Sequence, residues 1–89
     1  MSTSPTHWFV YIVMCRDGSL YTGISNDPVS RIAAHNAGKG AKYTKGRAPV
    51  VLKALYALDS KAAALKEEYR IKQLGKQAKI RLFNLIVKK

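Results

Sequence analysis

The sequence predicts a small α+β domain in which helices flank a three-stranded antiparallel sheet, in the order ββαβαα. Two apolar, β-branched runs surround a tight turn, a third run follows later, and segments with helical spacing come between and after them. The 89 residues are enough for one domain with a modest core. We expect residues 1–6 to form a flexible N-terminus, residues 7–83 the domain, and residues 84–89 a basic C-terminal end.

The first half of the chain is expected to form a β-hairpin followed by a helix. Residues 8–15 are a continuous apolar and aromatic run, residues 17–18 (Asp-Gly) are a turn sequence, and residues 20–25 form the returning strand. Residues 26–28 (Asn-Asp-Pro) are a typical helix start, and Gly38 is a natural C-terminal stop.

The second half is expected to contain a loop, one strand and two helices. Residues 39–49 combine lysines, glycines and a proline, which indicates a loop. Residues 50–58 form the third strand, and a long helix follows from Ser60 to Leu74. Gly75 ends that helix, and a last helix runs from Lys76 to about Val87 with one partly apolar face.

The length of the hairpin loop decides whether Tyr11 and Tyr21 share a face of the sheet. Side chains alternate between the two faces along a strand, so a shift of one residue moves a side chain to the other face. A two-residue loop at residues 17–18 places the tyrosines on opposite faces. A three-residue loop at residues 17–19, or a β-bulge, places them on one face.

The charge of the chain predicts an anionic partner. Sixteen Lys and Arg residues against five Asp and Glu residues give a net charge of +11. Nucleic acid is the first candidate, because each neutralised phosphate releases counterions, and an acidic membrane surface is the second. Cys15 is the single cysteine, which excludes an intramolecular disulfide and a cysteine-based zinc cluster. No signal peptide or membrane-spanning run is visible, which favours a soluble, intracellular protein.

The two hairpin tyrosines, Tyr11 and Tyr21, are candidates for a site that cleaves phosphodiesters. Such a site needs an activated water, compensation for the phosphate charge, a cation and help for the leaving oxygen. A tyrosine serves as general base where nearby cations or a metal-bound water lower the cost of proton transfer, because its ordinary pKa is about 10. The alternative for each tyrosine is strand packing with the hydroxyl at the surface.

Arg31 and His35 are four residues apart and therefore lie on one helix face. Arg31 is suited to a bidentate phosphate clamp, and His35 to a hydrogen bond or a proton relay. The alternative is a solvated helix face with an incidental histidine.

Glu68 is the candidate metal ligand. It shares a helical stripe with Leu65 and Ile71, whereas Glu67 points about 100° away around the helix. Mg²⁺ often takes one or two carboxylates from the protein and its other ligands from water and phosphate. The alternative is an exposed ion pair between Glu68 and Lys72.

The loop after the first helix is a candidate nucleic-acid contact. Its glycines and cations are suited to following a phosphate backbone, and Tyr43 is suited to stacking on a base. The alternative is a solvated, charged loop. The proposed nucleic-acid-binding residues are cations of this loop and of the long helix: Lys39, Lys42, Lys45, Arg47 and Lys72.

Together these segments resemble the GIY-YIG nuclease superfamily, most closely its small, stand-alone bacterial branch. The segments that carry the resemblance are Val10-Tyr11-Ile12, Tyr21-Thr22-Gly23, Arg31 with His35, residues 38–44 and residues 64–72. The first motif departs from the family in having Phe9-Val10 before its tyrosine, and the second has Thr22 in place of isoleucine.

The resemblance implies metal-dependent cleavage of DNA, more than RNA, on an α/β sandwich. Tyr11 would be the general base, Tyr21 would position the water or the phosphate, and Arg31 would stabilise phosphate charge. Glu68 would hold one divalent cation, Mg²⁺ or Mn²⁺. His35 and Tyr43 would be auxiliary catalytic residues.

Two other interpretations stay open. The chain could be a basic nucleic-acid-binding module that kept the fold without catalysis, or an interaction protein that dimerises through the face of residues 83–87. The resemblance also implies a cytoplasmic, nucleoid-associated bacterial protein that does not bind membrane. A weak homodimer or a larger repair complex is compatible with it.

Overall fold

The computed structural model describes residues 7–84 and confirms the α+β fold. The three strands form one antiparallel sheet in the order β2-β1-β3, so β2 and β3 are its edges. A short 3₁₀ helix, η1, lies within the predicted loop. The elements in chain order are β1 (Trp8–Met14), β2 (Leu20–Ser25), α1 (Pro28–Asn36), η1 (Lys42–Thr44), β3 (Val51–Leu58), α2 (Lys61–Lys72) and α3 (Lys76–Ile80).

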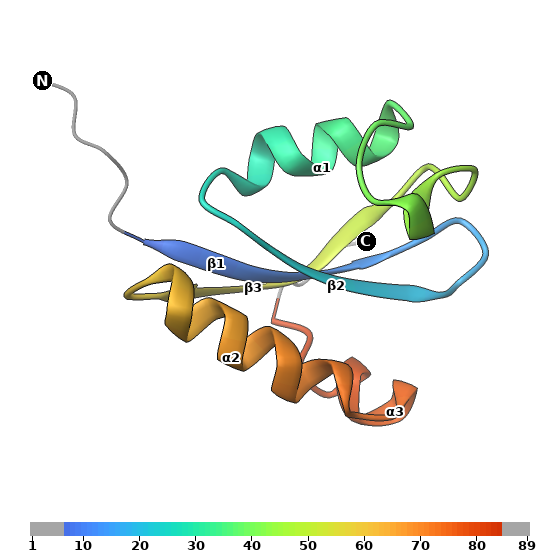
Figure 1. Cartoon of the computed structure of the whole chain (residues 1–89). Coiled ribbons are helices and arrows are strands. Elements are labelled where there is room, and N and C mark those ends of the chain that lie inside the picture. Colours follow the sequence, from blue (N-terminus) through green and yellow to red (C-terminus); the bar gives the residue numbers. More distant parts are fainter. Residues whose placement is uncertain (1–6, 85–89) are drawn as a thin grey trace, which may run out of the picture.

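The sheet lies between two unequal layers of helix (Figure 1). Helix α1 covers one face, and helices α2 and α3 cover the other. Because alternate side chains of β1 point to opposite faces, the strand supplies two cores. Val10 and Ile12 pack with Ala64 and Ile71 of α2. The second core lies on the α1 side and contains Tyr11, Val13, Cys15 and Val50.

The hairpin register places both tyrosines on the α1 face. Val13 pairs with Tyr21, and Tyr11 pairs with Gly23. The backbone N–H of Cys15 donates to the carbonyl of Ser19 at 2.8 Å, so the loop consists of residues 16–18. The two-residue loop is therefore wrong. The shared face matches the three-residue alternative, although the loop begins one residue earlier than residues 17–19.

The last helix is shorter than predicted. It ends at Ile80, not near Val87, because the chain turns back onto the sheet. Phe83 packs against the α2-side core. The backbone N–H of Asn84 donates to the Lys53 carbonyl of β3 at 3.1 Å, and its side-chain amide pairs with the backbone of Leu55. Val87 lies outside the described residues.

Both helices that begin at predicted caps do so with the expected side chains. The Asp27 carboxylate accepts from the Ser30 N–H, and the Ser60 hydroxyl accepts from the Ala63 N–H at 3.1 Å. None of the helices in residues 7–84 is long and apolar enough to cross a membrane.

Candidate active site

The centre of the site is a buried contact between Tyr11 of β1 and His35 of α1. The tyrosine is 1% exposed and the histidine 0%. The Tyr11 hydroxyl lies 2.9 Å from His35 Nε2. A buried tyrosine hydroxyl and a buried imidazole each need a polar partner, and here each supplies one to the other.

The loop that follows α1 closes around the imidazole. His35 Nδ1 lies 2.6 Å from the Thr44 hydroxyl, and Thr44 itself is fully buried. Gly40 passes so close that a Cβ on it would lie 2.2 Å from Nδ1. A side chain at residue 40 would therefore push the ring out of place.

The hydrogen bonds of Thr44 assign the proton of the neutral imidazole. Its hydroxyl lies 3.0 Å from the Ala41 carbonyl oxygen and donates its only hydrogen there. His35 Nδ1 then carries the ring proton and donates to Thr44, which leaves Nε2 to accept from Tyr11. In the opposite tautomer Nδ1 would accept from the Ala41 N–H, 3.4 Å away, and from the Thr44 hydroxyl. The Thr44 oxygen would then face the Ala41 carbonyl oxygen at 3.0 Å with no hydrogen between them.

Gly23 of β2 gives the Tyr11 ring its space. A Cβ at residue 23 would lie 2.5 Å from the Tyr11 hydroxyl oxygen and 3.1 Å from the Tyr21 ring. Because β2 is an edge strand, the missing side chain lets Tyr11 reach toward that edge. The glycine of the second motif is therefore a packing requirement of the tyrosine of the first.

Arg31 and Glu68 bring opposite charges to the same hydroxyl. Burial raises the pKa of Tyr11, and the nearby Tyr21 and Glu68 also raise it, whereas the Arg31 side chain beside the hydroxyl lowers it. Burial lowers the pKa of His35, and the positive charge of Arg31 lowers it further. At neutral pH the site therefore holds a neutral phenol and a neutral imidazole.

Aromatic rings continue the site outward from Tyr11. The ring of Tyr21 lies 6.3 Å from that of Tyr11 and 5.3 Å from that of His35. Tyr43 stacks on Tyr21 at 5.8 Å, and the Arg47 guanidinium lies 4.4 Å over the Tyr43 ring. Tyr43 remains 42% exposed, so it forms the outer end of this aromatic row.

The predicted nucleic-acid-binding residues fall into two groups. Lys39, Lys42 and Lys45 are exposed on the loop. Arg47 is held by the protein itself, because its guanidinium donates to the Asp17 carboxylate at 3.1 Å and to the Tyr43 carbonyl at 2.6 Å.

Lys72 is also engaged within the protein. Its amine lies 3.1 Å from the Glu68 carboxylate and 5.8 Å from the Tyr21 ring centroid. The ion pair considered as the alternative for Glu68 is thus present. Glu68 lies on the stripe of Ala64 and Ile71, which are buried, whereas Leu65 is 46% exposed and lies outside it. The predicted stripe was wrong in that one residue.

Comparison with known proteins identifies the family. Residues 7–81 match the model of the GIY-YIG catalytic domain. The chain belongs to the GIY-YIG family. The UPF0213 protein of Halobacterium salinarum is 53% identical over 74 residues, which cover 83% of this chain and 96% of that one. The UPF0213 protein of Staphylococcus haemolyticus is also 53% identical over 74 residues, which cover 83% and 90%.

Two solution NMR structures share this GIY-YIG fold. The UPF0213 protein of Bacillus halodurans is 47% identical, with a TM-score of 0.55 over 85% of this chain and 81% of that one. A protein from E. faecalis is 36% identical, with a TM-score of 0.58 over 92% and 88%. The resemblance drawn from the sequence is confirmed. It places the chain in a nuclease superfamily whose substrates are nucleic acids and whose members generally use a divalent metal.

The GIY-YIG residues of this chain fit a metal held by one carboxylate. Within residues 7–84 there is no cluster of three or more His, Cys, Asp or Glu side chains that could hold an ion. Glu68 has an 18% exposed side chain at the edge of the site, and the Lys72 amine contacts one of its oxygens. One carboxylate, with water and phosphate oxygens, satisfies the preference of Mg²⁺ or Mn²⁺ for oxygen ligands.

Sequence reasoning missed two residues of this GIY-YIG site, Thr44 and Gly40. Both were assigned only to a basic loop, and the roles considered there were phosphate contact and base stacking. Their importance depends on the loop folding back onto α1, where Lys39 N–H donates to the Ala34 carbonyl at 2.8 Å. Residues 38–44, which carry part of the family resemblance, were the available signal, but no periodicity in them indicates contact with His35.

Proposed function

We propose that this protein is a metal-dependent endonuclease that hydrolyses phosphodiester bonds, with DNA the preferred substrate over RNA. One observation carries the proposal: the Tyr11 hydroxyl lies 2.9 Å from His35 Nε2, and Arg31 and Glu68 are near enough to that hydroxyl to shift its pKa in opposite directions. Tyr11 comes from β1, Arg31 and His35 from α1, and Glu68 from α2. Arg31 would bind the scissile phosphate and offset its developing charge.

Tyr11 acts as general base in concert with His35. A neutral phenol with a raised pKa accepts the proton of water only if it passes its own proton on. His35 Nε2, at 2.9 Å, is the acceptor for that proton, and Nδ1 stays hydrogen-bonded to Thr44. The water oxygen then bonds to phosphorus as the bond to the leaving oxygen breaks, and the leaving oxygen takes a proton from a solvent water. The imidazolium returns its proton through Tyr11 to the hydroxide that this leaves, which balances the step.

Glu68 is the residue proposed to hold the divalent cation, Mg²⁺ or Mn²⁺. Bound there, the cation supplies Lewis acidity to phosphate oxygens. Lys72 contacts one oxygen of Glu68, which leaves the other oxygen for the cation, and the adjacent Lys72 amine would pair with a phosphate of the strand. The ring of Tyr21 lies 6.3 Å from that of Tyr11, and Tyr21 would position the water or the phosphate.

The test is a cleavage assay on supercoiled plasmid, branched DNA, single-stranded DNA and RNA, with Mg²⁺, Mn²⁺ or EDTA. Glu68→Gln should abolish cleavage, while Glu67→Gln is the matched control. Glu67 is the adjacent residue and pairs with Arg70 at 3.1 Å on another side of the helix. Equal cleavage by wild type and Glu68→Gln would contradict the proposed metal role.

A non-catalytic nucleic-acid-binding module is the second candidate. The Glu68–Lys72 ion pair favours it, because it already gives the carboxylate a partner without a metal. In that case no metal supports cleavage by wild type, and Glu68→Gln and wild type bind DNA equally and with strong salt dependence.

A further inference from the structure

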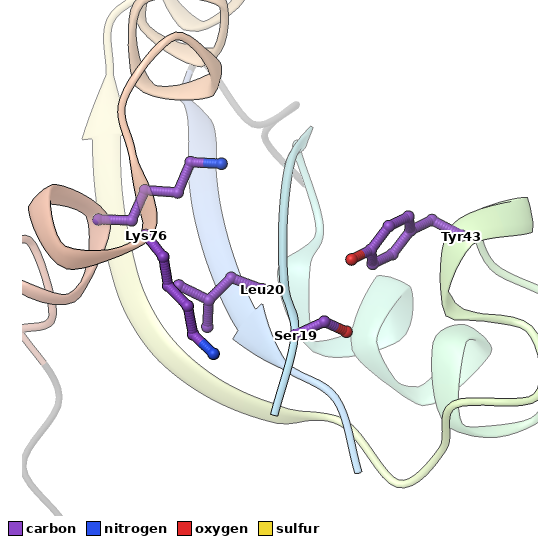
Figure 2. Close-up of a pocket in the computed structure, with 5 residues that line it drawn as sticks. Ser19, Leu20, Tyr43 and Lys76 are labelled. Atoms are coloured by element: carbon purple, nitrogen blue, oxygen red, sulfur yellow. The ribbon is translucent and has the colours of Figure 1, made fainter. Parts of the chain in front are cut away.

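A small pocket lies beyond the outer end of the aromatic row. Its volume is about 270 Å³, and its lining residues are Ser19, Leu20, Tyr43, Lys76 and Lys79. Figure 2 shows the Tyr43 hydroxyl pointing toward the segment that carries Ser19 and Leu20, and Lys76 approaching that segment from α3. The pocket thus joins the β1–β2 turn, the loop after α1 and the last helix.

The charge of this pocket is positive. Lys76 and Lys79 are three residues apart and therefore lie on one side of α3. None of the five lining residues carries a carboxylate, and no ion pair within residues 7–84 involves either lysine. The carboxylate of the β1–β2 turn, Asp17, already accepts from Ser19 and Arg47, and these hydrogen bonds lower its pKa to about 2.

The pocket adjoins the candidate active site through Tyr43. Tyr43 lines the pocket and stacks on Tyr21, whose ring lies against those of Tyr11 and His35. A strand whose scissile phosphate lies at Arg31 and Tyr11 therefore reaches the pocket by passing over Tyr43. Leu20 offers an apolar surface to a sugar, and the two amines and the phenol offer donors to phosphate oxygens.

We propose that this pocket is a second phosphate site, which binds a phosphate group of the substrate strand flanking the one that is cleaved. This inference rests on the proposed function, because it takes a nucleic-acid strand as the ligand. The phosphate is either an internal diester or the terminal phosphate of a strand end. Both present anionic oxygens to the same lysines and to Tyr43. The site fixes the position of the strand relative to Tyr11, and so fixes which bond is presented for cleavage.

The experiment is an NMR titration of the ¹⁵N-labelled full chain in EDTA, so that no strand is cut. The probes are a dinucleotide with one internal diester and no terminal phosphate, the same dinucleotide with a 5′-phosphate, and inorganic phosphate. We expect the amides of Ser19, Leu20, Lys76 and Lys79 to shift with a phosphate-bearing probe. Response to both dinucleotides identifies an internal diester as sufficient, and response only to the second identifies a terminal phosphate.

The variant is Lys76→Gln with Lys79→Gln, and its matched control is Lys53→Gln with Lys66→Gln. Lys53 lies on the opposite edge strand, and Lys66 lies about 200° around α2 from Glu68. The pocket variant should lose the amide shifts. On single-stranded DNA it should also lower the slope of log affinity against log salt by about 0.7 for each phosphate that is no longer neutralised. The control should keep the shifts.

Two results would overturn the inference: pocket amides that stay unmoved by every probe, or shifts that persist in the pocket variant. Dispersed amide spectra of both variants establish that they are folded. The readout requires no cleavage, so the two proposals can fail separately. Phosphate binding in this pocket by a protein that never cuts a strand would contradict the proposed function alone. Cleavage without any shift of the pocket amides would contradict the phosphate site alone.

Discussion

The hydroxyl of Tyr11 occupies the space beside Gly23 that any other residue at position 23 would fill. A Cβ there would lie 2.5 Å from the hydroxyl oxygen and 2.7 Å from the adjoining ring carbon. The two residues are direct partners across the β1–β2 pair. The tyrosine of the first motif and the glycine of the second are therefore one structural unit, since the second motif makes room for the first.

Gly23→Ala should displace Tyr11 from His35. Because Tyr11 is buried and its ring lies against those of Tyr21 and His35, we expect a loss of about 1–3 kcal/mol in the free energy of unfolding, the usual cost of overpacking. Cleavage should fall more steeply than stability explains. Urea unfolding and a nicking assay measure the two effects. Gly75→Ala is the control, because a Cβ at residue 75 meets nothing within 4 Å. Full activity in Gly23→Ala would contradict the role of this contact.

Thr44→Val removes a hydroxyl while keeping the shape of the side chain. His35 Nδ1 then loses its 2.6 Å partner, and leaving a buried donor unpaired costs about 1–3 kcal/mol. The imidazole is also no longer held in the tautomer that accepts from Tyr11, so we expect at least a ten-fold loss in cleavage rate. Stability and single-turnover rate are the measurements.

Thr22→Val is the matched control for Thr44→Val. The Thr22 hydroxyl is buried and has no hydrogen-bond partner within the described part of the chain. Replacing it with a methyl group should leave stability unchanged or raise it by up to about 1 kcal/mol, with cleavage unaffected. If the two valine variants lost the same amount of activity, Thr44 would have no specific role toward His35.

Some features that arrange the site can be predicted from the sequence, and others cannot. The order of elements, the caps at Asp27 and Ser60, and the shared helix face of Arg31 and His35 follow from local patterns, and those patterns are right. The shared face of Tyr11 and Tyr21 depends on one residue of loop length. Two turn geometries suit the same sequence there, so the register needed the structure.

Other features depend on contacts between distant parts of the chain. Gly40 and Thr44 surround His35 only because the loop returns to α1, which no period in the sequence records. The helical pattern after Gly75 does form a helix, but a short one. Packing of Phe83 on the core and hydrogen bonds from Asn84 to the β3 backbone stabilise the chain more than a further helical turn would. Tertiary contacts override local propensity at these positions.

Protonation of His35 should make the fold less stable in mild acid. The pKa of His35 is lowered in the folded chain, mainly by burial, relative to an ordinary value of 6.5. Between 6.5 and that lower folded value the unfolded chain binds more protons than the folded one, so the free energy of unfolding falls as pH falls. The contribution is fully present above about pH 6.5.

The measurement compares urea unfolding of wild type and His35→Gln between pH 7.5 and 5. The difference in unfolding free energy between the two should shrink as pH falls through that window, at up to about 1.4 kcal/mol per pH unit for one proton. Taking the difference removes the contribution of carboxylates common to both. A pH-independent difference would show that His35 titrates normally in the folded state.

Three exposed lysines of the loop, Lys39, Lys42 and Lys45, should account for part of the affinity for duplex DNA. Replacing all three with glutamine should lower the slope of log affinity against log salt by about 0.9 for each phosphate that these lysines neutralise in wild type. The fold should not change, because all three side chains are exposed. Fluorescence anisotropy across a salt series measures the slope, and an unchanged slope would place the binding face elsewhere on the molecule.

Arg31→Gln should raise the pKa of two groups at once. The Arg31 guanidinium, as a hydrogen-bond donor and a positive charge beside the Tyr11 hydroxyl, lowers the pKa of that hydroxyl. The positive charge of Arg31 also lowers the pKa of His35. Without the guanidinium the Tyr11 pKa rises further above 10.0, and the His35 pKa rises toward 6.5 but stays below it, because burial remains.

NMR titration of the His35 imidazole follows this change directly, and Arg70→Gln is the control. Arg70 pairs with Glu67 at 3.1 Å, so its loss should leave the His35 titration where it is in wild type. Cleavage should fall in Arg31→Gln, because the phosphate loses its clamp and the phenol holds its proton more tightly. An unmoved His35 titration would show that Arg31 points away from the tyrosine–histidine pair in solution, and Arg31 could not then bind the phosphate that Tyr11 faces.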